Sequence, residues 1–377
     1  MDNLTHSLIG LAASKAGLEK LSPGTTTLCL LAANAPDADI VSLLGGRWTY
    51  LHQHRGITHS IAGTLVLALA LPLVFYLVDW LLARFRNRPR RIKLRGLLIA
   101  SVLVSATHPL MDWTNNYGVR FLLPWDSGWS YGDMVFIIDP FLWLALGGSA
   151  FLLTARTRLQ GAVWLVIAAA TSFLVLFGPA VPGGLGNPTP LRIFWTAAVI
   201  LLVVLFKLDV GKRWGPKIPL AALCAIVIYI GALFGIHAIA LRQTELEAAS
   251  IAKENSEQAI KVAAMPTLAN PLQWLSVVET DRATYRFNLK LSGGDRDRAN
   301  LVRFEKPMGR DAAALANATR DPRSQVFLEF ARFPVVNVVG ADCITQSLVQ
   351  LADLRYTEPG RGRGTFSLEV PVECPVQ

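Results

Sequence analysis

The chain has 377 residues, of which 52% are hydrophobic and only 17% are charged. Soluble domains are commonly about one-quarter charged and less apolar, so this composition excludes an ordinary soluble enzyme and indicates an integral membrane protein. Much of the net charge of +9 lies in one loop, residues 84–95, between two apolar segments. Such a basic run more often marks the cytoplasmic side of a membrane than a nucleic-acid site. No recognition fold accompanies it, and we expect no nucleic-acid partner.

Two short apolar elements open the chain. Residues 4–17 have the pattern of a short helix with Thr5 as its N-cap, and residues 25–35 form a second element that Pro36 ends. Both are shorter than the roughly 20 residues that a membrane span needs. Two arrangements remain open, a hairpin that dips into the outer half of the membrane and buried helices of a small cap.

Six longer apolar segments are predicted to be membrane spans. The second is the most polar, because it carries Ser101, Ser105, Thr107, His108 and Asp112. Polar groups at that depth are usually functional or face the interior of a bundle. The predicted spans cover residues 61–83, 96–112, 134–154, 162–180, 191–208 and 218–241.

The distribution of Lys and Arg predicts an orientation. With six spans, the basic loops 84–95, 155–161 and 207–217 lie on one side, and the loops 113–133 and 181–190 are nearly free of Lys and Arg. The positive-inside rule then places the basic loops in the cytoplasm, so residues 52–59 and the end of the second span lie at the outer face. A spanning arm of the N-terminal hairpin would instead place them in the cytoplasm.

The last part of the chain changes character. The predicted membrane domain covers residues 1–241. Residues 242–271 are predicted to be a helical linker, and Pro266 and Pro271 mark its end. Residues 272–377 form the third domain, in which polar and apolar residues alternate as in strands. The predicted strands are 275–280, 284–291, 324–333 and 365–372. We therefore predict a polytopic α-helical membrane protein with an extracytoplasmic α+β domain, in which Cys343 and Cys374 can pair if the compartment is oxidising.

Histidines and aspartates gather in the N-terminal third. Five of the six histidines lie in the first 108 residues, and imidazole is the commonest metal ligand. His108 and Asp112 are four residues apart and share one face of a helix. Asp37 and Asp39 follow Pro36 in a turn, and His54 and His59 flank Arg55-Gly56. With His6, these residues make seven candidate metal ligands, His6, Asp37, Asp39, His54, His59, His108 and Asp112.

Each of these motifs also has a structural interpretation. His108 and Asp112 suit a hydrogen-bonded pair inside a bundle, and either Asp37 or Asp39 suits the N-cap of the next helix. Thr58 is a candidate cap for the first span. Arg55 can bind a phosphate or form an ion pair with Asp37 or Asp39.

The order of these motifs resembles a known family. Thr5-His6, Pro36-Asp37-Ala38-Asp39, the block from His54 to Ser60, and His108-x3-Asp112 are similar to those of the YdjM-like inner-membrane proteins, described as membrane-bound metal-dependent hydrolases. The matching motifs cover residues 1 to about 125, and the C-terminal sheet domain resembles a tail of longer relatives. The HxxxD pattern is also distantly similar to that of zinc-dependent phospholipases C and related nucleases, although this chain lacks a later HxxxE.

The resemblance and the residues together lead to one functional expectation. We expect a hydrolase with one to three divalent ions, zinc being favoured over manganese or iron, at the outer face of a bacterial cytoplasmic membrane. The expected substrate is a phosphoester or lipid-linked molecule, with Asp37 as a candidate base for a metal-activated water and Arg55 steadying negative charge. The alternative is a non-enzymatic envelope assembly or sensing protein with a structural metal. The sequence leaves the oligomeric state open.

Overall fold

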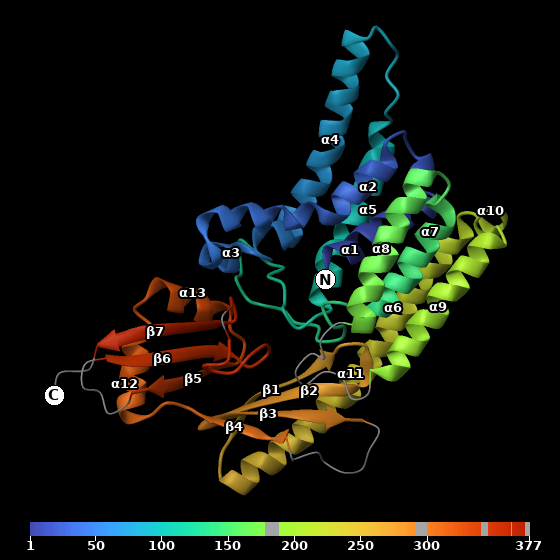
Figure 1. Ribbon diagram of the computed structural model, residues 1–377. Coiled ribbons are helices and arrows are strands. Elements are labelled where there is room, and N and C mark those ends of the chain that lie inside the picture. Colours follow the sequence, from blue (N-terminus) through green and yellow to red (C-terminus); the bar gives the residue numbers. More distant parts are fainter. Residues whose placement is uncertain (178–187, 292–299, 341–345, 363, 374–377) are drawn as a thin grey trace. The chain divides into compact units, whose positions relative to one another are not determined.

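The computed structural model describes residues 1–177, 188–291, 300–340, 346–362 and 364–373. Its chain divides into two compact units (Figure 1). The first unit comprises Met1–Ala38, Arg55–Phe234 and Thr267–Asn270, and the second comprises Asp39–His54, Gly235–Pro266 and Pro271–Gln377. The boundary at residue 38 differs from the predicted membrane domain 1–241, because residues 39–54 belong to the second unit.

The predicted fold class is confirmed by the helices of the N-terminal region and the sheets that follow. The described residues contain six helices long and apolar enough to cross a membrane. Five of them are α4, α5, α8, α9 and α11, which span Ile61–Phe85, Leu94–Trp113, Arg158–Phe177, Thr189–Lys207 and Lys217–Asn255. The sixth, Thr25–Gly45, joins α2 (Thr25–Asn34) to a 3-10 helix, η2 (Ala35–Gly45).

This set of six differs from the predicted set in two members. The α-helix α2 ends before Pro36 as expected, but the apolar chain continues as a 3-10 helix and reaches 21 residues. The predicted span 134–154 is shorter, because the helical stretch begins only at Pro140, with Asp139 as its N-cap. It consists of α6 (Pro140–Leu142), a π-helix, η4 (Trp143–Gly147), and α7 (Gly148–Thr154).

The N-terminal helix α1 (Asn3–Lys15) packs closely on α2. A Cβ atom on Gly10 would lie 2.5 Å from the Cys29 carbonyl oxygen, so only glycine permits this approach. The N-cap of α1 is Asp2, whose carboxylate accepts from the Thr5 amide, and not Thr5 as predicted. On the other side of α2, an apolar core joins it to α5 through Leu28, Leu97 and Val104.

The polar residues of α5 lie on its buried face. Ser101, Ser105, His108 and Asp112 are all at most 1% exposed. Their spacing of four, three and four residues places them along one stripe of the helix. The sequence expectation that these groups face a bundle interior therefore holds for α5.

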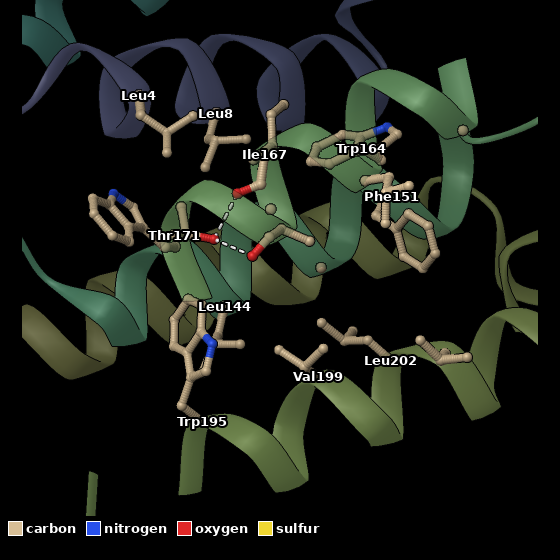
Figure 2. A pocket seen from close by; sticks show the side chains of 17 residues that line it. Leu4, Leu8, Leu144, Phe151, Trp164, Ile167, Thr171, Trp195, Val199 and Leu202 are labelled. Carbon is tan, nitrogen blue, oxygen red and sulfur yellow. Dashed lines mark hydrogen bonds between the residues drawn. The ribbon is translucent and has the colours of Figure 1, made fainter. Parts of the chain in front are cut away.

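An apolar cavity of about 250 Å³ lies beside α1 (Figure 2). Leu4 and Leu8 of α1, the π-helix, α8 and α9 surround it, with the indole rings of Trp143, Trp164 and Trp195 in its wall. The Thr171 hydroxyl donates to the Ile167 carbonyl of its own helix, at 2.8 Å. The wall is therefore suited to hydrocarbon.

Two antiparallel sheets form the second unit. One has the order β1-β2-β3-β4 and the other β5-β6-β7. Ala263, Val277, Val335 and Leu354 belong to a core that the two sheets share. The strands are β1 (Ala259–Thr267), β2 (Asn270–Thr280), β3 (Ala283–Lys290), β4 (Val302–Glu305), β5 (Pro334–Val339), β6 (Gln346–Asp353) and β7 (Ser367–Glu373).

Two sequence expectations for this unit are wrong. The segment predicted as strand 324–333 is helix α13 (Pro322–Phe330), which Asp321 caps and Pro322 begins. The sheet starts at Ala259 and not at 272, because α11 ends at Asn255 and β1 lies within the predicted linker 242–271. Cys343 and Cys374 lie outside the described residues.

Helices also cover the second sheet. Helices α12 (Gly309–Ala318) and α13 pack on β6 and β7, and their core includes Phe327, Val349 and Leu351. Trp48 of the short helix α3 (Arg47–Gln53) packs against the same core. This contact explains why residues 39–54 group with the C-terminal sheets.

Candidate metal centre

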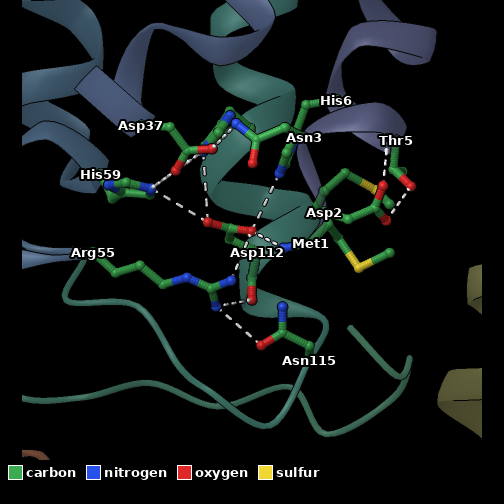
Figure 3. A network of polar contacts seen from close by, with 12 residues as sticks. Met1, Asp2, Asn3, Thr5, His6, Asp37, Arg55, His59, Asp112 and Asn115 are labelled. Atoms are coloured by element: carbon green, nitrogen blue, oxygen red, sulfur yellow. Dashed lines mark hydrogen bonds and ion pairs between the residues drawn. The ribbon is translucent and has the colours of Figure 1, made fainter. Parts of the chain in front are cut away.

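Four of the predicted ligands meet in the first unit. Asp37, His59, His108 and Asp112 each present one ligand atom, and the four atoms lie within 4.8 Å of one another. Asp37 belongs to η2, His59 to the 3-10 helix η3 (Ile57–His59), and the other two to α5. His59, His108 and Asp112 are at most 1% exposed. Figure 3 shows the labelled Asp37, His59 and Asp112 pointing toward one another.

The separations between these atoms match those of a tetrahedral metal site. The Nε2 atoms of His59 and His108 are 3.1 Å apart. Asp37 Oδ1 is 3.3 Å and 3.4 Å from these two nitrogens, and Asp112 Oδ2 is 3.3 Å and 3.5 Å from them. Zinc bonds of roughly 2.0–2.1 Å place tetrahedral ligands about 3.3–3.4 Å apart. These five separations are compatible with two imidazoles and two carboxylates around one ion.

The Nδ1 atoms of His59 and His108, which do not face the cluster, have partners that orient the two rings. His108 Nδ1 is 2.6 Å from the Ala33 carbonyl oxygen. A carbonyl only accepts, so Nδ1 carries the proton and Nε2 of the neutral ring presents its lone pair to the cluster. Ala33 is among the last residues of α2, whose carbonyls lack intrahelical partners. His59 Nδ1 lies 3.1 Å from the Thr58 hydroxyl, which serves the same purpose.

His6 contacts the cluster from behind Asp112. Its Nε2 is 3.3 Å from Asp112 Oδ1, the oxygen that does not face the four-atom cluster, and its ring stacks on His108 at 3.8 Å between centroids. Burial lowers the pKa of His6 to about 3, so the ring is neutral at physiological pH. The Met1 amino group also donates to Asp112 Oδ1. His6 thus lies next to the cluster, but it contacts the second oxygen of Asp112 and is not one of the four clustered ligand atoms.

Arg55 is buried beside the same carboxylate. Its guanidinium donates to Asp112 Oδ1 at 3.1 Å, to the Asp112 carbonyl at 3.2 Å and to Asn115 Oδ1 at 3.0 Å. It also lies 4.5 Å over the Tyr117 ring. Its ion-pair partner is therefore Asp112, and not Asp37 or Asp39 as the sequence suggested. These contacts favour a role in holding Asp112 over direct contact with a substrate phosphate.

The loop around Arg55 has an unusual backbone. Arg55 itself adopts a left-handed conformation with φ 54°, a cost that a non-glycine residue sustains only when its surroundings fix it. The helix α4 then begins after Ser60, whose side chain accepts from the Gly63 amide at 3.0 Å. Ser60, and not Thr58, is therefore the cap.

Asp39 and His54 lie in the second unit, outside this four-residue cluster. His54 Nδ1 is 3.1 Å from Asp39 Oδ1, so the two residues pair with each other. His52 is exposed on α3 and lies 3.7 Å from Glu329 of α13, also in the second unit. The prediction that His54 and Asp39 are metal ligands remains a prediction.

Asp37 is the most accessible member of the cluster. Its side chain is 17% exposed, whereas the other three are buried. Its second oxygen, Oδ2, accepts from the exposed Asn3 side-chain amide at 3.0 Å. The cluster is therefore most accessible to solvent on the side of Asp37 and Asn3.

Two asparagines near the cluster escaped the sequence analysis. Asn3 contacts Asp37, and Asn115 contacts Arg55. Asn115 lies three residues beyond Asp112, just past the end of α5. That proximity to a predicted ligand was the available signal, but the partner of Arg55 depends on how the chain folds back.

A larger groove adjoins the segments that carry the ligands. It has a volume of about 810 Å³ and lies between α4, α5 and the loop 121–130. We call it the α4–α5 groove. Its wall is apolar along the helices, through Ile61, Leu65, Ala106 and Leu110, and carries Asp126 and Ser130 at the loop. Ile61 and Leu110 are two residues from His59 and His108.

Comparisons with known proteins agree with the motif resemblance. Residues 1–181 match the family model described as YdjM inner membrane protein. "Uncharacterized protein YfhP" of Bacillus subtilis (strain 168) is 27% identical over 155 residues, which are 38% of this chain and 44% of that protein. The chain thus spans less than half of the length of this relative. No solved structure matches the chain. All four residues of the cluster lie in residues 1–181, the region that is similar to the YdjM inner membrane protein family.

Proposed function

We propose that the protein is a membrane-bound metal-dependent hydrolase of phosphoesters. The observation that supports this proposal is the cluster of Asp37, His59, His108 and Asp112, whose atoms stand at the ligand separations of one tetrahedral ion. Zinc fits best because it accepts both imidazole and carboxylate ligands in this geometry. Manganese and iron also accept this donor set.

The residues of the chain divide the work of hydrolysis. A divalent ion held by these four residues would supply Lewis acidity, and a water that joined them as a fifth ligand would have its pKa lowered to about 7. Asp37 Oδ2 points toward the accessible side and is the candidate base for the proton of that water. The water oxygen would form a bond to phosphorus as the ester P–O bond breaks, and the departing alkoxide would take up the proton that Asp37 accepted from the water. Arg55 and His6 hold Asp112 in place.

The α4–α5 groove favours a lipid-linked substrate. Its walls are formed by α4 and α5, and each of these helices is long and apolar enough to span a membrane. Its polar end is the loop 121–130. Its volume of about 810 Å³ lies within the common range of ligand pockets. We propose that the hydrocarbon chain of the substrate lies along Leu65 and Ala106. The phosphate then approaches the end of α5 that carries Asp112.

The first test is the metal content of purified protein. We expect about one zinc per chain, and loss of that zinc in His59→Ala and Asp112→Ala. His52→Ala is the matched control, because His52 is exposed and lies in the second unit. Unchanged metal content in the two cluster variants would refute the ligand roles.

The second test separates a hydrolase from a structural metal site. The metal-loaded protein should hydrolyse bis-p-nitrophenyl phosphate, and His59→Ala should lose this activity. A protein that binds one metal per chain tightly, but hydrolyses neither this ester nor a phospholipid, would favour the alternative, a non-enzymatic envelope assembly or sensing protein.

A further inference from the structure

Asn115 is a fully buried residue beside Arg55, which also binds the candidate ligand Asp112. Its side chain has 0% exposure, and it follows α5 by two residues. The carbonyl oxygen of its side chain, Oδ1, accepts two hydrogen bonds, from Arg55 Nη1 at 3.0 Å and from the Tyr117 amide at 2.8 Å. The same guanidinium holds Asp112, so one side chain positions both a candidate ligand and Asn115.

These two hydrogen bonds fix the orientation of the amide. Arg55 and the Tyr117 backbone N–H can only donate. If the amide were rotated by half a turn, its NH2 group would face two donors. The oxygen must therefore point to Arg55 and Tyr117, and the nitrogen must point away from them.

The amide nitrogen has no acceptor among the described residues. Asn115 Nδ2 is buried, and no protein atom in the described ranges accepts a hydrogen bond from it. A buried donor without a partner costs about 1–3 kcal/mol, so such a group in a native site calls for a ligand or another explanation. Figure 3 shows this nitrogen on the face of Asn115 that is turned toward Asp112.

We propose that the Asn115 side-chain NH2 is a catalytic donor that binds the phosphoryl oxygen on which negative charge grows during hydrolysis. This inference rests on the proposed phosphoester hydrolysis and adds a residue that contacts the substrate. A fixed donor aimed at the position of developing charge stabilises the transition state, because it needs no reorganisation during the reaction. The hydrogen bond from Arg55 to Oδ1 polarises the amide and strengthens its N–H groups as donors.

Two substitutions separate the two ends of the amide. Asn115→Asp keeps an oxygen for Arg55 and Tyr117 and replaces the donor by a second oxygen. Asn115→Ala removes both ends. If Asn115 only holds Arg55, then Asn115→Asp should preserve both stability and activity better than Asn115→Ala. If the NH2 group binds phosphate, the two variants should rank in opposite orders for stability and for phosphate binding.

The measurements are made on the full-length protein in detergent with zinc added. We expect Asn115→Asp to melt close to wild type and Asn115→Ala to melt lower, with zinc content unchanged in both. The affinity for inorganic phosphate, measured by titration calorimetry, should fall roughly tenfold in Asn115→Ala. It should fall further in Asn115→Asp, because the new carboxylate repels the phosphate. The kcat for bis-p-nitrophenyl phosphate should fall about 10²–10³-fold in Asn115→Asp, as for loss of one such donor. Asn337→Asp, an exposed change of the same charge in β5, should alter none of these values.

The outcomes distinguish this inference from the proposed function. Hydrolysis by the wild type with no loss in Asn115→Asp would overturn the role of Asn115 and leave the hydrolase proposal standing. Phosphate binding that depends on Asn115, without hydrolysis of any phosphoester, would support the donor and overturn the hydrolase. A wild-type protein that binds zinc but not phosphate would overturn the donor itself.

Discussion

The buried pair between Arg55 and Asp112 makes a quantitative prediction. Arg55→Met keeps the length of the side chain and removes the charge. Because Met and Arg are both unbranched L residues, the left-handed backbone at this position costs about the same in each. The difference between the two proteins therefore reports the guanidinium contacts.

The magnitude follows from burial. Arg55 is 2% and Asp112 is 1% exposed, and breaking a buried ion pair by removing one partner costs about 3–5 kcal/mol. A folded unit of this size loses roughly 2–4 °C of melting temperature per kcal/mol. We therefore expect the metal-free protein to melt about 6–20 °C lower. Arg55→Lys should recover part of this loss, because it retains the charge without the two-pronged geometry.

Bound metal should reduce this effect. A cation at Asp112 Oδ2 also neutralises the carboxylate, so the loss in Arg55→Met should be smaller with zinc than with a chelator. Melting can be followed by the fluorescence of the ten tryptophans. Arg242→Met is the control, because Arg242 forms an exposed pair with Glu245 that contributes little. A shift below about 2 °C in the chelated protein would refute the coupling between Arg55 and Asp112.

Two further predictions concern the substrate and the orientation in the membrane. Ala106→Trp should fill the α4–α5 groove and abolish hydrolysis of a long-chain phospholipid, but not of bis-p-nitrophenyl phosphate. Leu103 is exposed and lies outside the groove lining, so Leu103→Trp should leave hydrolysis of both substrates unchanged. Equal loss on both substrates would contradict the groove as a site for the lipid chain. In a cysteine-free background, Trp125→Cys should react with a membrane-impermeant thiol reagent added to intact cells, and Asn87→Cys in the basic loop should not. The reverse pattern would place the candidate metal centre at the cytoplasmic face.

The sequence was informative where a local pattern has one structural solution. The long apolar runs 61–83 and 191–208 could only be stabilised as spans, and α4 and α9 cover them. The spacing of His108 and Asp112 on one helical face also survives folding, because it depends on helix geometry alone. By contrast, the alternation in 324–333 suits a strand and also a short amphipathic helix, and the Asp321-Pro322 start decides for the helix.

Tertiary structure decided which distant residues meet. The four cluster residues converge because α2 packs on α5 and the chain bends at Arg55. Neither this packing nor this bend can be predicted from a local sequence pattern. The same bend sends Arg55 to Asp112, while Trp48 anchors residues 39–54 in the C-terminal unit. The sequence by itself determined the membrane class, the kinds of ligand and most of the spans, since these follow from composition and helical spacing. Packing between segments far apart in the chain decides which residues form the cluster, which residue pairs with Arg55 and how the Asn115 amide is oriented. Only the folded structure determines these three features.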